Sequence, residues 1–94
     1  LAAGRVSQAV THRTVEEIWY VVEGRGQMWR RQGEHESVVD LQPGVCLTLP
    51  VGTRFQFRAA ADEGVCAVAI TMPPWPGPDE AVPVAGPWTP SPET

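Results

Sequence analysis

Short β-prone runs, each closed by Gly, Pro or an acidic residue, constrain the fold of this chain more than any other feature. Seven such runs occupy the first 72 residues, and no stretch has a helical period. Strands of this length and spacing are typical of an all-β sandwich or barrel. The predicted strands are Val6–Thr11, Glu17–Glu23, Gly26–Arg31, Ser37–Leu41, Val45–Leu49, Arg54–Arg58 and Val65–Thr71.

The faces of two of these strands follow from their alternation. From Thr53 to Arg58, Thr and Phe occupy the odd positions and Arg and Gln the even ones, which predicts one buried face with Phe55 pointing inward. Between Glu17 and Glu23 both faces are apolar except at Glu17. Such a strand is covered on both sides, and we expect the C-terminal tail or another subunit on its outer face.

The segment after residue 72 has a different composition. It holds eight of the ten prolines, together with Trp75 and Trp88. This proline density excludes a helix or a central strand, whereas large aromatic side chains anchor irregular segments to a surface. We therefore divide the chain into a barrel, residues 1–72, and a proline-rich C-terminal extension, residues 73–94, that packs on the barrel or on a partner subunit. A free proline-rich recognition peptide is the alternative.

Size and charge narrow the classes of function. A chain of 94 residues forms one small domain, which buries about 60–65% of its unfolded surface. The net charge is −4, and Arg30 and Arg31 are the only adjacent basic pair, so we expect neither nucleic acid nor membrane as a partner. Cys46 and Cys66 lie in apolar runs without CxxC spacing. We expect both to be buried free thiols of a cytoplasmic protein.

Two spaced motifs run through the predicted strands. With five, one, four and six residues between its members, the first motif consists of Gly4, Val10, His12, Glu17 and Gly24. With five, one and two residues between its members, the second consists of Gly44, Pro50, Gly52 and Phe55. Their order and spacing resemble the two motifs of the cupin superfamily, over roughly residues 4–71. The resemblance implies a double-stranded β-helix, or jelly roll, with the functional site inside the barrel mouth.

The resemblance also implies a metal site of two histidines and a glutamate from the first motif and a third histidine from the second. At these positions the chain has Val10, His12, Glu17 and Phe55, so only His12 and Glu17 match the family's ligands. A divalent ion needs three or four N or O donors from one pocket. Gln8 lies on the same predicted face and is a further donor. The expected cofactor is therefore none, or a single divalent ion of Fe, Mn, Ni, Zn or Cu bound weakly by His12 and Glu17.

Without a metal, the same positions describe a small-molecule pocket. We assign its lining to Gln8, Val10, Trp19 and Phe55. A carboxylate that holds an imidazole in one tautomer forms a general acid or base, which gives His12 the catalytic role and Glu17 the orienting role. Core packing of Trp19 and a satisfied buried His12–Glu17 pair without chemistry are the structural alternatives.

Three functions follow from these readings. The first is a metal-independent isomerase, epimerase or cyclase, which resembles metal-free cupins such as sugar epimerases and the small cupins of aromatic polyketide cyclisation. The second is a weak divalent-metal cupin of the oxygenase or isomerase type. The third is a non-catalytic ligand-binding or sensor module, since fold alone does not choose among them. The doubly apolar strand Glu17–Glu23 and the aromatic tail also predict a homodimer.

Overall fold

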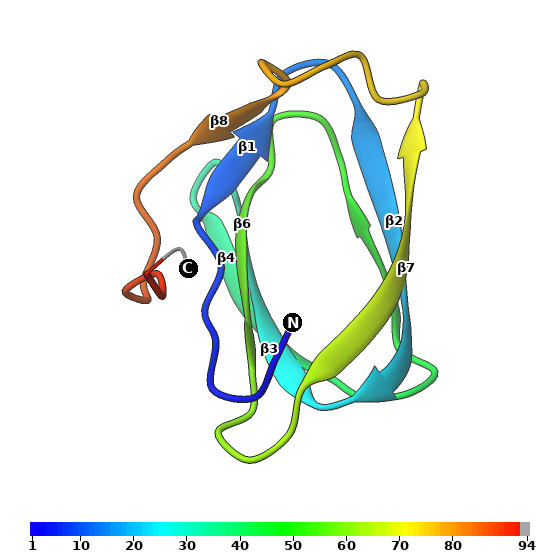
Figure 1. The fold of residues 1–94 in the computed structure, drawn as a ribbon. Coiled ribbons are helices and arrows are strands. Elements are labelled where there is room, and N and C mark those ends of the chain that lie inside the picture. Colours follow the sequence, from blue (N-terminus) through cyan, green and yellow to red (C-terminus); the bar gives the residue numbers. More distant parts are fainter. Residues whose placement is uncertain (93–94) are drawn as a thin grey trace.

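The computed structural model describes residues 1–92 and contains eight β-strands in two antiparallel sheets. The sheets face each other across a hydrophobic core (Figure 1). One has five strands in the order β4-β3-β6-β1-β8, and the other has three in the order β5-β2-β7. The strands are β1 (Val10–His12), β2 (Glu16–Gly24), β3 (Gly26–Gln32), β4 (His35–Leu41), β5 (Cys46–Leu49), β6 (Arg54–Ala59), β7 (Val65–Met72) and β8 (Ala81–Pro83). The predicted all-β jelly-roll barrel is therefore confirmed.

The first and last strands differ most from the sequence prediction. β1 begins at Val10, because Val6 forms only an isolated bridge with Arg58 and the intervening residues leave the ladder. β8 was not predicted, and it pairs with β1 through contacts that include Val10 opposite Pro83. Proline is tolerated there because β8 is the edge strand of its sheet, where one side of the strand needs no N–H donor. No helix in the described chain is long and apolar enough to cross a membrane.

One hydrophobic core lies between the sheets. Its buried members are Trp19, Val21, Met28, Leu41, Leu47, Leu49, Phe55, Ala59 and Val65. Only 4% of Phe55 is exposed, which confirms that it points inward. Phe55 therefore lies on the buried face of β6 that the alternation predicts, although Gln56 on the other face is buried as well.

Two glycines let the β2–β3 connection approach its neighbours closely. Gly24 has a φ of +88°, and a Cβ there would lie 1.9 Å from the carbonyl oxygen of Gly64. A Cβ on Gly26 would lie 2.2 Å from the carbonyl oxygen of Arg58. Only a residue without a side chain fits either position.

The β5–β6 turn is tied to the end of β1. The Thr53 N–H donates to the Pro50 carbonyl at 3.0 Å, and the Gly52 N–H donates to the His12 carbonyl at 3.3 Å. Gly52 has a φ of +84°, which glycine adopts without strain. This turn sends β6 back alongside β1, so the second motif reaches the first.

The segment after β7 lies against the five-stranded sheet. The side chain of Gln56, on β6, is fully buried, and it donates to the Trp88 carbonyl at 2.8 Å and accepts from the Trp88 N–H at 3.1 Å. The Arg58 guanidinium stacks 4.0 Å from the centre of the Trp88 ring. These contacts satisfy a buried amide and hold the tail on the sheet. The last two residues of the predicted extension, 93 and 94, lie outside the described chain.

The outer face of the three-stranded sheet is exposed rather than covered by the tail. Tyr20 on β2 and Val68 and Ile70 on β7 are each more than half exposed. Both cysteines are free and exposed, so the prediction that they are buried was wrong. Cys46 pairs with Tyr20, and side chains opposite each other in a ladder share one face, which here points outward.

Candidate functional site

The two motifs meet on the inner wall of the barrel. Antiparallel pairing of β1 with β6 places Val10 directly opposite Phe55, and both side chains contact the core. Glu17 projects from β2 on the facing sheet, on the same face as the buried Trp19 two residues later. Phe55 therefore stands where the resemblance implied a histidine, without a shift of register.

His12, the last residue of β1, is enclosed by aromatic rings. It is 6% exposed, and the rings of Phe55 and Trp75 each meet the imidazole edge-on at a centroid distance of 5.1 Å. Within the described chain its Nδ1 is buried and has no hydrogen-bond partner. An unpaired buried polar atom costs about 1–3 kcal/mol, so this nitrogen is available to a ligand that brings a partner.

Glu17 and His12 are not hydrogen-bonded to each other. Glu17 is half-buried, with Leu49 and Thr71 as its neighbours across the ladders. Among residues 1–92 no hydrogen bond reaches the Glu17 carboxylate. The direct His12–Glu17 pair considered from the sequence is therefore not formed in this structure.

The donor set does not fit a tightly held metal ion. Residues 1–92 contain no group of three or more His, Cys, Asp or Glu side chains placed to hold one. Val10 and Phe55 have no donor atoms, and the Phe55 ring takes up space beside the imidazole. Protein zinc sites use at least three protein ligands, whereas His12 and Glu17 supply only two.

The two other predicted lining residues lie in different surroundings. Trp19 is 8% exposed and packs edge-on against Phe57 at 4.8 Å, and its buried Nε1 has no partner in the described chain. Gln8 is exposed, and its amide donates to the carbonyls of Ala9 at 3.2 Å and Val84 at 3.5 Å. Gln8 precedes β1, so the strand alternation that predicted an inward side chain does not extend to it.

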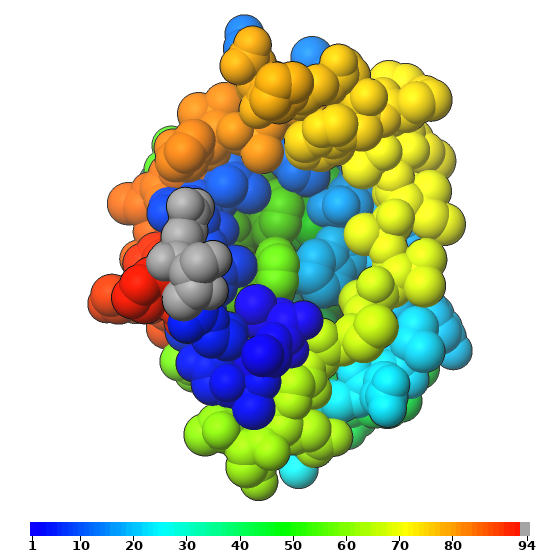
Figure 2. Space-filling model, viewed as in Figure 1, coloured from blue at the N-terminus to red at the C-terminus, as the bar shows by residue number. Residues whose placement is uncertain are grey.

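Figure 2 shows a hollow between the β1–β8 side of the barrel and β7. The colours of its floor belong to β2 and to the β5–β6 region. The segment from Pro73 to Glu80, which joins β7 to β8, crosses one end of this hollow (Figure 1). This rim segment carries Trp75, which is 46% exposed and contacts His12.

Glu80 fastens the rim segment to the loop between β1 and β2. Its carboxylate accepts from the Thr14 N–H at 2.6 Å, the Thr14 hydroxyl at 2.5 Å and the Val15 N–H at 2.9 Å. Burial alone raises the pKa of Glu80, but these hydrogen bonds outweigh it and lower the pKa to about 2. The rim is thus held by an ionised carboxylate that is bonded to Thr14 and Val15, the second and third residues after His12.

Sequence reasoning missed the parts that Trp75 and Glu80 play at this site. It expected Trp75 to anchor the tail, but no spacing rule places residue 75 beside residue 12. Glu80 lies in an irregular proline-rich run, where no period predicts its burial. The sequence around it, Asp79-Glu80-Ala81-Val82-Pro83, carries no signal that distinguishes Glu80 from its acidic neighbour.

Comparisons with known proteins agree with this geometry. The family model for the cupin domain matches residues 1–71. No curated protein sequence matches the chain. The match to the cupin-domain model covers both motifs and all of β1 to β6.

Solved structures share the fold. Oxalate decarboxylase from B. subtilis superposes with a TM-score of 0.76 at 13% identity, over 89% of this chain and 22% of that one. The coconut allergen cocosin gives 0.70 at 19% identity, over 76% and 19% of the two chains. A cupin protein from Bacteroides fragilis gives 0.62 at 25% identity, over 82% and 64%. The chain thus spans about one fifth of the first two proteins and under two thirds of the third.

Proposed function

Because the chain belongs to the cupin family, we propose that its barrel binds a small organic molecule beside His12, and that binding requires no metal ion. The observation that carries this proposal is the position of Phe55, which is 4% exposed and 5.1 Å from the imidazole. A mostly apolar cavity with a few polar groups is typical of small-molecule sites. The neighbours in fold include a decarboxylase and a plant allergen, so the fold alone does not indicate a function.

The unpaired polar atoms inside the barrel indicate which hydrogen-bonding groups such a ligand carries. The Trp19 indole N–H is a donor only, and the His12 Nδ1 needs either a donor or an acceptor, depending on its tautomer. A ligand hydroxyl group both donates and accepts, so it suits either kind of atom. Trp75 covers His12 at the rim, so the ligand displaces this ring to reach the imidazole.

A titration followed by NMR tests the proposal. Cyclic polyols and substituted phenols would be added to the labelled protein, and the indole N–H signals of Trp19 and Trp75 would be monitored. We expect at least one compound to give a saturable shift that is lost in His12→Ala and kept in His35→Ala, which removes the exposed second histidine. Shifts that survive His12→Ala, or none across the panel, would reject the proposal.

Metal-independent isomerisation, epimerisation or cyclisation is the second candidate function. It is favoured by the unpaired imidazole nitrogen, because a free nitrogen next to a bound ligand is what general acid–base catalysis needs. In this scheme His12 moves the proton, and ligand binding brings Glu17 into hydrogen-bond contact with the imidazole. Turnover that is abolished in His12→Ala and reduced in Glu17→Gln, with ligand binding retained in Glu17→Gln, supports it. Turnover unchanged in both variants excludes it.

We also propose that the exposed face of β5-β2-β7 mediates a homodimer. The strand residues of this sheet cover about 340 Å² per copy at roughly 3.4 by 4.8 Å each. Burying two such faces removes about 700 Å² of surface from water, which is less than the 1,200 Å² or more that a stable interface buries. The proposed dimer is therefore weak and forms only at high protein concentration.

A further inference from the structure

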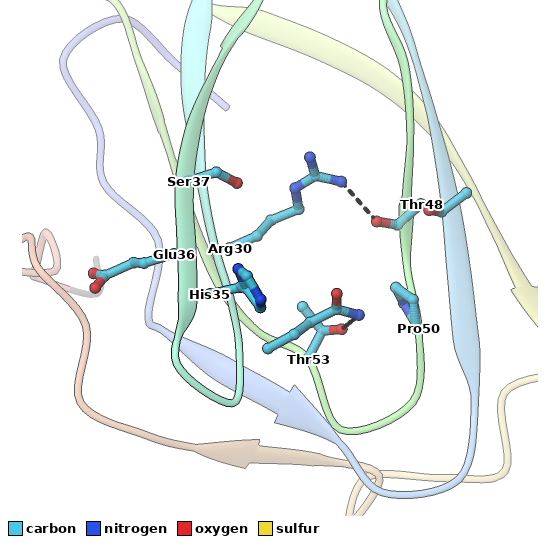
Figure 3. A pocket seen from close by; sticks show the side chains of 8 residues that line it. Arg30, His35, Glu36, Ser37, Thr48, Pro50 and Thr53 are labelled. Carbon is cyan, nitrogen blue, oxygen red and sulfur yellow. Dashed lines mark hydrogen bonds between the residues drawn. The ribbon is translucent and has the colours of Figure 1, made fainter.

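A second cavity lies on the opposite side of Phe55 from His12, at the β3–β4 hairpin end of the barrel. Its volume is about 260 Å³, enough for about eight water molecules at roughly 30 Å³ each. Strand β6 lies between β3 and β1, so Phe55 faces Val10 on one side and Arg30 on the other. Figure 3 shows the residues around this cavity, which are contributed by β3, β4, β5 and the β5–β6 turn.

The inner face of the β3–β4 hairpin changes from apolar to polar along its length. Met28 pairs with Val39 in the core, but the next inward pairs are Arg30 with Ser37 and Gln32 with His35. Inward positions of a small barrel are filled by apolar side chains. Arg30 is half-buried, whereas Gln32, His35 and Ser37 are exposed, so these pairs form a polar lining at the open end of the barrel.

Arg30 has one unused face. Its Nη1 donates to the Thr48 carbonyl at 3.0 Å, and its Nε is buried without a partner in the described chain. No hydrogen bond from its Nη2 is formed within residues 1–92. The Nε–H and Nη2–H groups of a guanidinium point the same way, and this edge matches the two oxygens of a carboxylate.

The charge around Arg30 is not neutralised by the protein. Among residues 1–92 no carboxylate lies within 4 Å of the guanidinium, and the one acidic side chain at the cavity, Glu36, points away from it (Figure 3). The Glu36 carboxylate instead accepts from the indole N–H of Trp29 at 2.6 Å. A cation that is half-buried without a counter-ion favours an anionic partner.

Hydroxyl and amide groups complete the lining. Gln32 donates to the Thr53 hydroxyl at 3.0 Å, and the Ser37 hydroxyl points into the cavity beside Arg30 (Figure 3). These groups can form hydrogen bonds with ligand oxygens other than those of a charged, anionic group. The lining therefore suits a small acid that also carries hydroxyl groups.

We propose that this cavity is a binding site for a small hydroxy-carboxylic acid, with its carboxylate held by the Nε–H and Nη2–H edge of Arg30. The carboxylate-binding group, Arg30, lies on β3, whereas His12 lies on β1, so the site stands independently of the proposed function. On binding, the guanidinium turns its free edge into the cavity. The two charge-assisted hydrogen bonds to the acid then supplement or replace the single neutral one to Thr48.

The test is an NMR titration of the full chain with sodium lactate and sodium gluconate, observed at the Arg30 Nε–H and at the backbone N–H groups of Ser37 and Thr53. We expect saturable shifts with at least one of the two acids, and none with sodium chloride or with sorbitol, the uncharged counterpart of gluconate. Arg30→Lys keeps the charge but loses the paired donors, so it raises the Kd at least tenfold. Arg54→Gln, which removes an exposed arginine at the same end of the barrel, changes the Kd less than twofold.

Three outcomes overturn the proposal. One is the absence of a saturable shift with either acid up to about 100 mM, and another is equal affinity in the wild type and Arg30→Lys. The third is tighter binding of inorganic phosphate than of both acids through the same signals, which would change the ligand class. His12→Ala leaves the titration unchanged, so failure here is distinct from failure of the proposed function. Circular dichroism checks that each variant is folded.

Discussion

Replacing Phe55 by alanine tests whether this ring fills the centre of the barrel. It is 4% exposed and belongs to the core, and its ring contacts His12 edge-on. A buried aromatic side chain removes 150–250 Å² from water, and at about 25 cal/mol per Å² this stabilises the fold by about 4–6 kcal/mol. Alanine recovers part of this term, and measured Phe→Ala changes cost about 3–5 kcal/mol. We therefore expect Phe55→Ala to lose about 4 kcal/mol.

Urea denaturation followed by circular dichroism measures this loss. A domain of 94 residues has a free energy of unfolding of about 5–14 kcal/mol. With a urea dependence of about 1–2 kcal/mol per M, the midpoint falls by about 2–4 M. Phe55→Leu is the matched control, because it keeps most of the volume and loses mainly the aromatic contact, at a cost of about 1 kcal/mol.

The vacated space makes a second readout available. An apolar cavity left by a large-to-small substitution stays dry and binds benzene. Benzene is therefore expected to raise the urea midpoint of Phe55→Ala and to leave that of the wild type unchanged. A loss below 1 kcal/mol in Phe55→Ala would refute the inward packing of this ring, and with it the separation of the His12 hollow from the Arg30 cavity.

Three further predictions concern the rim, the β2–β3 connection and the exposed sheet. The pKa of Glu80 is about 2 in the folded chain against 4.5 for the free side chain, so its contribution to the stability of the fold is complete above about pH 4.5 and is lost as the pH falls towards 2. In an acid titration, Glu80→Gln should therefore lose less stability over this range than the wild type. Equal losses would contradict the role assigned to this carboxylate. Gly24→Ala should prevent folding, because its Cβ would collide with the Gly64 carbonyl. Gly44 has a similar φ of +92° but open space around it, so Gly44→Ala should cost only about 1–2 kcal/mol of backbone strain, as measured by thermal unfolding. Similar losses of stability in both variants would show that Gly24 does not lie close to the Gly64 carbonyl. Sedimentation at rising protein concentration should show self-association that is abolished in Val68→Glu. Val38 is equally exposed, at 53%, but lies on the other sheet, so Val38→Glu should leave self-association intact. A monomer mass at every concentration would exclude the dimer.

The strand pattern predicted most of this fold because the side-chain period of a β-strand is set by local geometry. The inward direction of Phe55 and the bounds of six strands to within two residues followed from alternation and from glycine and proline positions. Alternation failed at Gln8, which precedes β1 and lies outside the β1–β6 ladder. The burial predicted for both cysteines was wrong, because an apolar run does not reveal which face of a sheet is covered.

The site was less predictable because its parts come from distant segments. The contact of Trp75 with His12 depends on the path of a proline-rich rim, which has no period. The Arg30 cavity depends on the pairing of β3 with β4, which turns separate polar residues into one lining. Once the register is known, the hairpin sequence identifies the polar end of the barrel, since two inward pairs are polar and the preceding pair is apolar.

A crystal structure with anomalous data, from protein purified without chelators, tests the central claim most directly. We expect organic or water density in the hollow beside His12 and no anomalous peak there, with the Phe55 ring in edge contact with the imidazole. An anomalous peak about 2.0–2.2 Å from a nitrogen of His12 and an oxygen of Glu17 would contradict it, since those are metal–ligand distances.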